Sequence, residues 1–190
     1  MAKTAKITKE SIAAAALEII RESGTDMLNA RSLALRLGCS TQPIFSNFTS
    51  MDEVKAEAGK LAFAYYDECI KAAMESGKYP PYKAAGMAYI RFAAEEKQLF
   101  KLLFMCDRTG NNVEDDLTDE TDVKIISMIA SALSIPNDAA RRLHRESWLF
   151  VHGIASMVVT SFADYSENEV SAMLTDMYVG LSMKAKEDAK

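Results

Sequence analysis

Thr41 and Gln42 are two small polar residues at the expected N-terminal end of a short helix. Gly38 can take the left-handed conformation that ends a helix, Ser40 is a favourable N-cap residue, and Pro43 suits a first helical turn. The hydroxyl and amide groups of Thr41 and Gln42 could therefore hydrogen-bond the base edges or phosphates of a nucleic acid.

The residues ahead of this turn have the pattern of a second short helix, with Leu33, Ala34 and Leu37 on one side. Two short helices joined by a glycine turn are typical of a helix-turn-helix unit, whose second helix enters the major groove of DNA. The alternative is an ordinary corner between two helices of an all-α core. This pattern alone leaves both interpretations open.

The surrounding sequence extends the pattern over residues 7–55. The positions that carry it are Ile12, Ala16, Leu17, Ile20, Glu22, Gly24, Leu33, Ala34, Leu37, Gly38, Ser40, Phe45, Phe48, Ser50, Glu53 and Val54. Together they resemble the DNA-binding domain of the TetR family of bacterial transcriptional regulators. Met51 stands where the family usually has Lys, and Phe45 stands where it often has Tyr. Each departure removes one group that could contact DNA.

The resemblance and the helix positions together predict the roles of individual side chains. Thr41 and Gln42 would reach bases, and the residues around them, with the N-terminal lysines, would hold phosphates. Phe45 and Phe48 would pack the recognition helix onto the first and fourth helices. The predicted DNA-binding residues are Asn29, Arg31, Ser40, Thr41, Gln42, Phe45, Asn47 and Lys55.

Length and composition predict an all-α chain of about nine helices in two domains. The chain has 190 residues, of which 49% are hydrophobic. We expect a DNA-binding domain at residues 1–50 and a ligand-binding and dimerisation domain at residues 51–190, with a fourth helix connecting them. No apolar run approaches the roughly 18 residues of a membrane span, and no leader precedes the first helix, so we expect a cytoplasmic protein.

Capping residues and apolar periodicity locate the expected helices. Thr8, Asn29, Ser50 and Ser166 are the expected N-caps, and Ser50 and Ser166 are each followed by a glutamate in the spacing of a capping box. The fourth helix should end near Ser76. Later helices are expected at residues 82–96, 99–105, 121–134, 138–162 and 166–184, with a polar loop at residues 107–118.

The charge is unevenly distributed along the chain. The net charge is −5, yet residues 1–60 contain eight Lys and Arg against seven Asp and Glu. We call residues 1–60 the head and the remaining residues the body. Because the head is near neutral, with lysines at its N-terminus, and the body is acidic, electrostatic attraction would turn the head toward phosphate. Cys39, Cys69 and Cys106 have no close spacing, so they fit neither a disulfide framework nor a zinc site.

Two segments of the body resemble one C-terminal subclass of TetR regulators, which is named for its Trp, His and Gly. One is Phe92-Ala93-x-Glu95 followed by Leu99-Phe100-x-Leu102-x-Phe104, and the other is Trp148 followed by His152-Gly153. Lys97 replaces the proline that usually lies between the two helices of the first segment. The resemblance does not identify a ligand.

The last two helices carry more apolar surface than one core can cover. Residues 148–162 are apolar nearly all round, and the last helix has an apolar stripe. We expect two helices from each chain to form a four-helix homodimer interface, as the family resemblance also implies; the alternative is a monomer with unusually apolar last helices. The predicted interface residues are Phe150, Ile154, Val158, Val170, Leu174, Met177 and Leu181.

Aromatic and methionine side chains in the body suggest a ligand pocket. The predicted wall residues are Phe92, Phe100, Phe104, Met105, Trp148, His152 and Met157. Ligand sites are mostly apolar with a few orienting polar groups, which here would be Trp148 and His152. Each residue could equally be plain core, and His152 could serve only to hydrogen-bond a carbonyl while Gly153 lets two helices approach.

No sequence pattern of an enzyme is present. His144 and His152 are too far apart on one helix to share a metal ion, and the aspartates of residues 107–122 lack calcium-loop spacing. We therefore expect no catalytic residue, metal or cofactor. The expected function is a repressor that binds a palindromic operator as a dimer and is released by a small hydrophobic or amphipathic effector. The alternatives are a DNA-binding regulator without small-molecule sensing and a helical protein-interaction adaptor.

Overall fold

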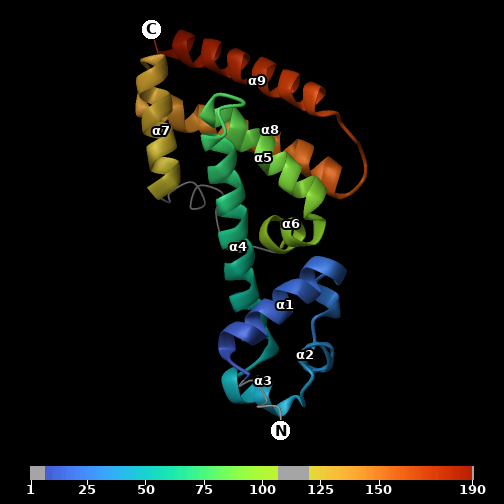
Figure 1. Cartoon of the computed structure of the whole chain (residues 1–190). Helices are drawn as coiled ribbons and strands as arrows, with labels where there is room; N and C mark the ends of the chain where they lie inside the picture. Colours follow the sequence, from blue (N-terminus) through green and yellow to red (C-terminus); the bar gives the residue numbers. More distant parts are fainter. Residues whose placement is uncertain (1–6, 107–119, 190) are drawn as a thin grey trace. The chain divides into compact units, whose positions relative to one another are not determined.

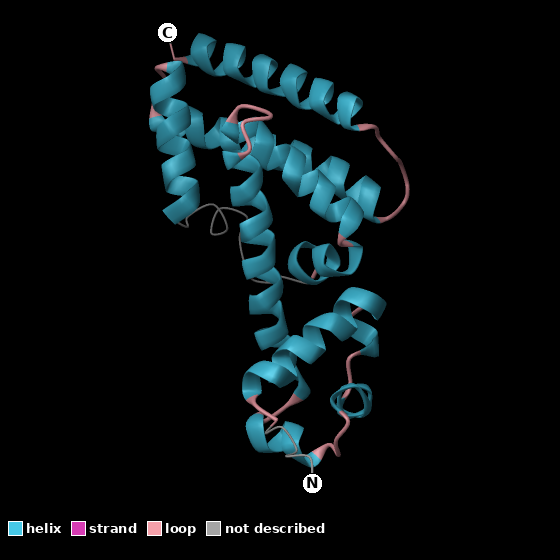
Figure 2. Cartoon of the chain, in the orientation of Figure 1, coloured by secondary structure: helices cyan, strands magenta, loops and turns pink. Residues whose placement is uncertain are grey.

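The computed structural model describes residues 7–106 and 120–189 and confirms the all-α prediction. Over these residues the chain forms nine α-helices and one short 3-10 helix, and no strand (Figure 1; Figure 2). No helix in these ranges is long and apolar enough to cross a membrane. The polar loop predicted at residues 107–118 lies outside the described part of the chain.

The helices divide into two compact units. The first unit comprises Met1–Cys69 and Glu95–Cys106, and the second comprises Ile70–Ala94 and Asp107–Lys190. The first contains α1 (Lys9–Ser23), η1 (Thr25–Met27), α2 (Ala30–Leu37), α3 (Gln42–Asn47), most of α4 (Met51–Glu75) and α6 (Lys97–Phe104). The second contains the last turns of α4 and the helices α5 (Pro81–Glu95), α7 (Glu120–Leu133), α8 (Asn137–Val159) and α9 (Glu167–Asp188).

The first unit is built around side chains that are fully or almost fully buried. They come from every main helix of the unit: Ile12, Ala16 and Ile20 of α1, Leu33 of α2, Ile44 of α3, Phe48 beyond it, Val54 and Ala58 of α4, and Leu99 and Phe100 of α6. Because these residues recur at helical spacing, each short helix buries one face and leaves the other exposed.

Local capping determines where the first helices begin and end. Thr8 and Asn29 cap their helices, as predicted, and each also forms a capping box, with Ser11 and Ser32 at the third helical position. Gly38 ends α2 in the left-handed conformation, with φ 65° and ψ 34°, which a glycine adopts without steric cost. These caps satisfy the backbone groups that helix ends leave unpaired.

Two predicted caps differ in detail from the structure. The N-cap of α3 is Thr41 rather than Ser40, and no side chain bonds the first amides of this helix. At the start of α4, Ser50 accepts a hydrogen bond from the Glu53 amide, but the Glu53 carboxylate accepts from the backbone and hydroxyl of Thr49. The predicted Ser50 capping box is therefore only half formed, whereas that of Ser166 and Glu169 is complete.

The second unit has its own core between α7, α8 and α9. Its buried members are Ile126, Ile129, Ile135, Ala140, Leu143 and Ala185, with Tyr82, Tyr178 and Leu181 packed against them. Helix α5 contributes Ala88, Tyr89, Ile90 and Phe92 to the buried residues of the same unit. These contacts hold α8 and α9 together along one face.

Candidate DNA-binding surface and effector cavity

Helix α3 is anchored by one face and presents the other. Ile44 is fully buried and Phe48 is 2% exposed, whereas Phe45 is 51% exposed. The prediction that both aromatic residues pack the recognition helix onto its neighbours is therefore wrong for Phe45. Ile44 within α3 and Phe48, the C-cap residue directly after it, are the two side chains that are buried. Ile44 fills the place predicted for Phe45.

Six of the eight predicted DNA-binding residues have exposed side chains. They are Asn29, Arg31, Ser40, Gln42, Phe45 and Lys55, whereas Thr41 and Asn47 are half-buried. Gln42 is the first residue of α3, where a side chain at a helix N-terminus can reach a groove. The exposed side of the helix thus carries one amide and one aromatic ring that the packing of the unit leaves available.

Hydrogen bonds within the chain already occupy the two predicted asparagines. The Asn29 Oδ1 atom accepts from the amides of Arg31 and Ser32, each at 3.0 Å, and its Nδ2 donates to the Met27 carbonyl at 3.3 Å. The Asn47 Nδ2 donates to the Pro43 carbonyl at 2.8 Å. Asn29 therefore caps α2, and Asn47 closes α3 onto its own first turn.

The cations of the first unit fall into two groups. Lys9 donates to Glu53 at 2.8 Å, and Arg36 forms two hydrogen bonds to Glu22, at 2.6 and 2.7 Å. Lys9 and the Thr49 groups lower the pKa of Glu53 to about 2. The side chains of Arg31 and Lys55 form no hydrogen bond or ion pair with any described residue. These two side chains are therefore available for phosphate, whereas Lys3 and Lys6 lie outside the described residues.

A network of polar contacts fixes the end of α1 against α6 within the first unit. The Arg21 Nε donates to the Glu96 carboxylate at 2.8 Å, and its Nη2 contacts the second oxygen. The Tyr65 hydroxyl of α4 donates to the same carboxylate at 3.4 Å, and the Arg21 guanidinium lies 5.3 Å from the Tyr65 ring centroid. Three helices are thus joined at one carboxylate.

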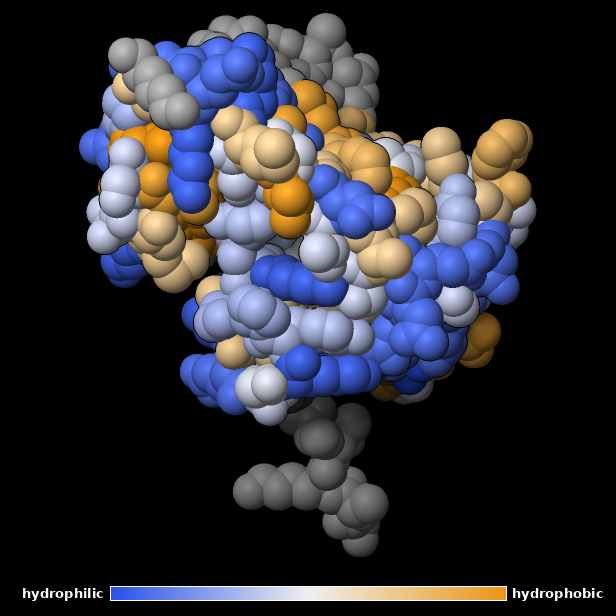
Figure 3. Space-filling view, turned by 90° about the horizontal axis from the view of Figure 1, so that it is seen from above, coloured by the Kyte–Doolittle hydropathy of each residue, from blue (hydrophilic) through white to orange (hydrophobic). Residues whose placement is uncertain are grey.

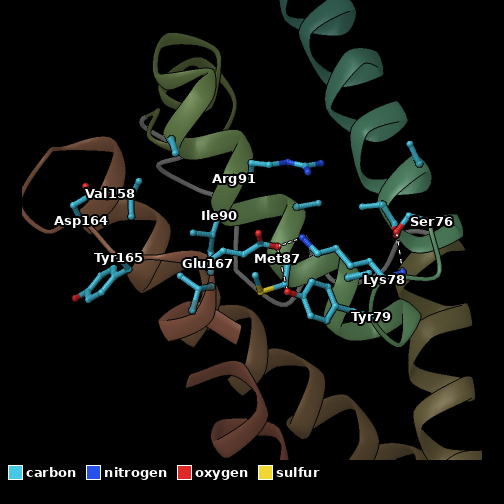
Figure 4. Close-up of a pocket in the computed structure, with 16 residues that line it drawn as sticks. Ser76, Lys78, Tyr79, Met87, Ile90, Arg91, Val158, Asp164, Tyr165 and Glu167 are labelled. Atoms are coloured by element: carbon cyan, nitrogen blue, oxygen red, sulfur yellow. Dashed lines mark hydrogen bonds and ion pairs between the residues drawn. The ribbon is translucent and has the colours of Figure 1, made fainter. Parts of the chain in front are cut away.

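The second unit contains a cavity of about 460 Å³, within the size range of small-molecule sites (Figure 4). Its walls come from the end of α4, from α5, from the end of α8 and from the start of α9. The lining residues are Ala72, Ala73, Ser76, Lys78, Tyr79, Ala84, Met87, Ala88, Ile90, Arg91, Ala94, Val158, Asp164, Tyr165, Glu167 and Val170. Most of these side chains are small or apolar.

An ion pair on one side of this cavity joins segments that are far apart in sequence. Lys78 donates to the Glu167 carboxylate, and the Tyr79 hydroxyl donates to the same oxygen at 3.2 Å (Figure 4). The contact raises the pKa of Lys78 and lowers that of Glu167. The positive charge of Arg91 adds to the lowering at Glu167 and opposes the rise at Lys78 without reversing it. The pair fixes the loop after α4 to the start of α9 on one side of the cavity.

None of the seven residues predicted as pocket walls lines this cavity. Phe100, Phe104 and Met105 belong to the first unit, and Phe92, Trp148, His152 and Met157 belong to the second. Phe92 and Phe100 are buried, whereas Met105 and Met157 are 44% and 41% exposed. The assignment of these residues to a ligand stays a prediction.

Two Tyr–His pairs join α5 to α8. The Tyr82 hydroxyl lies 3.0 Å from the His144 Nδ1, and the Tyr89 hydroxyl lies 2.9 Å from the His152 Nδ1. His144 also contacts Asp122 at 3.1 Å, and Trp148 stacks on His152 with ring centroids 5.1 Å apart. Burial lowers the pKa of His152. The His152 Nδ1 thus lies within hydrogen-bond distance of a tyrosine hydroxyl, a partner that the sequence did not predict.

The predicted dimer residues divide between the core and the surface. Ile154, Val158, Val170 and Leu174 are each 9% exposed or less in the single chain, so they pack inside the protomer. Phe150 remains 39% exposed, and Met177 and Leu181 are half-buried. The assignment of the four buried residues to a partner surface is therefore revised. Apolar periodicity located the face of each helix that packs inward.

The opposite faces of α8 and α9 carry exposed apolar side chains of their own. Leu149, Phe150 and Met157 of α8 and Val179 and Met183 of α9 are 39% to 68% exposed. Gly153 and Gly180 lie among them with open space where a β-carbon would stand. Figure 3, seen from the side on which α9 lies, shows apolar residues at the surface among hydrophilic ones. We call these five apolar residues the outer apolar face.

Comparison with known families decides the identity of the second unit. Residues 82–178, about half of the chain, match the family model of a tetracyclin repressor-like C-terminal domain. The chain belongs to the TetR family of transcriptional regulators. The match includes the Trp148 segment, and it confirms at the level of the family the resemblance found from sequence.

Solved structures share the fold of this TetR regulator. A protein from Pseudomonas aeruginosa PAO1 described as a transcriptional regulator aligns with a TM-score of 0.67 over 100% of this chain and 99% of its own, at 13% identity. A transcriptional regulator from Rhodococcus sp. Rha1 aligns with a TM-score of 0.60 over 95% and 98% of the two chains, at 20% identity. At these identities the likeness concerns the fold. No curated protein sequence gave a match.

Sequence reasoning missed the residues around the cavity for a physical reason. Lys78 and Glu167 are separated by 89 positions, and neither belongs to a motif. The break Tyr79-Pro80-Pro81 did indicate a loop, but not its partner at the start of α9. The two Tyr–His pairs had a weak signal, since buried polar side chains on apolar helix faces require hydrogen-bond partners.

Proposed function

We propose that the chain is a dimeric repressor that binds a palindromic operator through α3 and releases it when a small amphipathic effector enters the second unit. The operator-binding part rests on the geometry of α3, whose buried Ile44 and exposed Gln42 and Phe45 leave one face available for a groove. Arg31 and Lys55 supply phosphate contacts beside it. In this proposal the protein acts by binding, not by catalysis.

The observation that carries the effector response is the course of α4. This helix begins beside Thr49 and Ser50, directly after the α3 segment, and its last turns supply Ala72 and Ala73 to the cavity. A molecule that displaces those turns would move a helix whose other end directly follows the α3 segment in the chain. An effector shifts operator binding only by its differential affinity for the two conformations, and a coupling of about 1–3 kcal/mol suffices for regulation.

The dimer is proposed to form through the outer apolar face. A soluble chain gains free energy by covering large apolar side chains, and helices α8 and α9 offer five of them close to two glycines. Stable homodimer interfaces commonly bury on the order of 2,000 Å² or more. Two heads related by a two-fold axis then require two half-sites arranged as an inverted repeat, about one helical turn or more apart.

Gln42→Ala and Lys55→Ala test the operator-binding part. Gln42→Ala should cost about 1–3 kcal/mol of binding free energy and relax sequence preference, because it removes a base contact. Lys55→Ala should weaken all duplexes alike and reduce the salt dependence, because it removes a phosphate contact. The measurement is a fluorescence-anisotropy titration with a duplex that the wild-type protein selects from a random-sequence library, and with a scrambled duplex.

The same measurements can contradict both the role of Gln42 and DNA binding itself. If Gln42→Ala kept both operator affinity and sequence preference, Gln42 would not be a base-contacting residue. If the wild-type protein selected no sequence and showed no salt-dependent binding, the DNA-binding proposal itself would fail, and the interaction-adaptor alternative would replace it.

A further inference from the structure

We propose that the cavity of the second unit is a site for a small monoanionic amphipath, with its carboxylate on Arg91 and its apolar tail between α5, α8 and α9. The proposal deepens the effector part of the proposed function and rests on it for any effect on the operator. Ligand binding itself depends only on the residues of the second unit.

Arg91 is the charged group around which the site is built. Its side chain lines the cavity, and it forms no hydrogen bond or ion pair with a residue of the described chain. In Figure 4 it extends from α5 toward the last turns of α4. An arginine presents a planar fork of donors that matches the two oxygens of a carboxylate. The Arg91 guanidinium therefore offers hydrogen-bond donors to a carboxylate bound in the cavity.

The surrounding charges favour an anion at this end of the cavity. The only carboxylate close to Arg91 among the described lining residues is Glu167, whose oxygen already accepts from both Lys78 and Tyr79. Lys83 adds another positive charge 5.1 Å from the Tyr79 ring centroid and donates to Thr175. Because Glu167 is already paired with Lys78, an added anion at this end of the cavity would balance the charge of Arg91.

Asp164 is the second carboxylate of the lining, and it belongs to the other side of the cavity. It lies beside Tyr165 in the connection between α8 and α9, on the far side of α5 from Arg91 in Figure 4. A cationic or zwitterionic ligand would place its positive charge on the Asp164 carboxylate, so these are the ligand classes that compete with an anion. The two charged residues therefore give a matched pair of variants.

The remaining walls define the rest of the ligand. Met87 and Ile90 of α5, Val158 of α8 and Val170 of α9 are apolar, and the alanines of α4 and α5 leave space between them. An unbranched methionine can re-pack around varied shapes. A volume of about 460 Å³ accommodates a carboxylate with a tail of several methylene groups.

Isothermal titration calorimetry with three probes of one tail length tests the charge preference: octanoate, octanamide and octylamine. Octanoate should bind one site per chain about tenfold or more tightly than octanamide, because only the anion forms charge-assisted hydrogen bonds with Arg91. Hexanoate should bind more weakly than octanoate by about threefold to fourfold per methylene group. Octylamine should bind most weakly of the three eight-carbon probes.

Arg91→Gln and Asp164→Asn locate the binding. Arg91→Gln should bring octanoate down to the affinity of octanamide, while Asp164→Asn should leave the preference for octanoate intact. Both changes are at exposed side chains, so circular dichroism should show wild-type folding. The inference is overturned if octanoate binds no better than octanamide, if Arg91→Gln keeps the preference, or if octylamine binds best and loses affinity in Asp164→Asn.

The same proteins separate this inference from the proposed effector response. Octanoate that binds through Arg91 and weakens wild-type operator binding, but not that of Arg91→Gln, supports both. Octanoate that binds through Arg91 and leaves operator affinity unchanged supports the anion site and overturns its coupling to DNA. Absence of binding overturns the anion site and leaves operator binding by the head untouched.

Discussion

Replacing Leu174 with Glu should unfold the second unit, whereas replacing Val179 with Glu on the same helix should give a folded monomer. Leu174 is 4% exposed, and its Cδ1 atom would lie 3.1 Å from a β-carbon added at Gly86. An unpaired carboxylate at that position costs more than about 4 kcal/mol of unfolding free energy, since it is buried without a partner. Val179 is 49% exposed, so a carboxylate there stays hydrated in the protomer.

The loss of the dimer in Val179→Glu follows from the two-fold symmetry of the proposed interface. Each interface would bury two new carboxylates, which should raise the dimer dissociation constant by about a hundredfold or more. Operator affinity should fall with it, because a monomer binds only one half-site. Sedimentation velocity at micromolar concentration and an operator titration measure the two effects.

Val123→Glu provides the matched control. Val123 is 53% exposed on α7, a helix that contributes no residue to the outer apolar face, and receives the same substitution. It should leave both the dimer and operator affinity unchanged. A stable wild-type monomer, or a Val179→Glu protein that remains a dimer, would contradict the proposed interface. A folded Leu174→Glu monomer would instead return Leu174 to the partner surface.

The contrast between Leu174 and Val179 also shows what the sequence can and cannot predict. Apolar spacing places Val170 and Leu174 on one face of α9, and both are buried as a periodic face should be. The same spacing cannot say whether the face meets its own chain or a partner, because either contact removes apolar surface from water. Only the positions of α5 and α8 decide the question.

Features that depend on neighbouring residues were predicted most accurately. The Thr8, Asn29 and Ser166 caps and the Gly38 turn are local hydrogen-bonding and backbone effects, and all four are confirmed. The cavity depends instead on contacts such as Lys78 with Glu167, which only the tertiary fold brings together. The sequence therefore predicted the helices of the site but not the charged groups that line it.

The second large effect concerns two adjacent residues of α3. Ile44→Ala should destabilise the first unit by about 2–5 kcal/mol, because Ile44 is fully buried and its truncation leaves a cavity. Phe45→Ala should change the free energy of unfolding by less than about 0.5 kcal/mol, because its ring is 51% exposed. Urea denaturation followed by circular dichroism measures both values.

Operator binding should rank these variants differently from stability. Phe45→Ala should weaken the selected operator by about tenfold although the protein is fully folded, because an exposed ring on the α3 face is proposed to contact DNA. Phe45→Tyr should bind at least as tightly as wild type, since it adds a hydroxyl that can hydrogen-bond a phosphate. If Phe45→Ala kept full operator affinity, α3 would approach DNA by another face. If it lost stability as Ile44→Ala does, Phe45 would belong to the packing of the head.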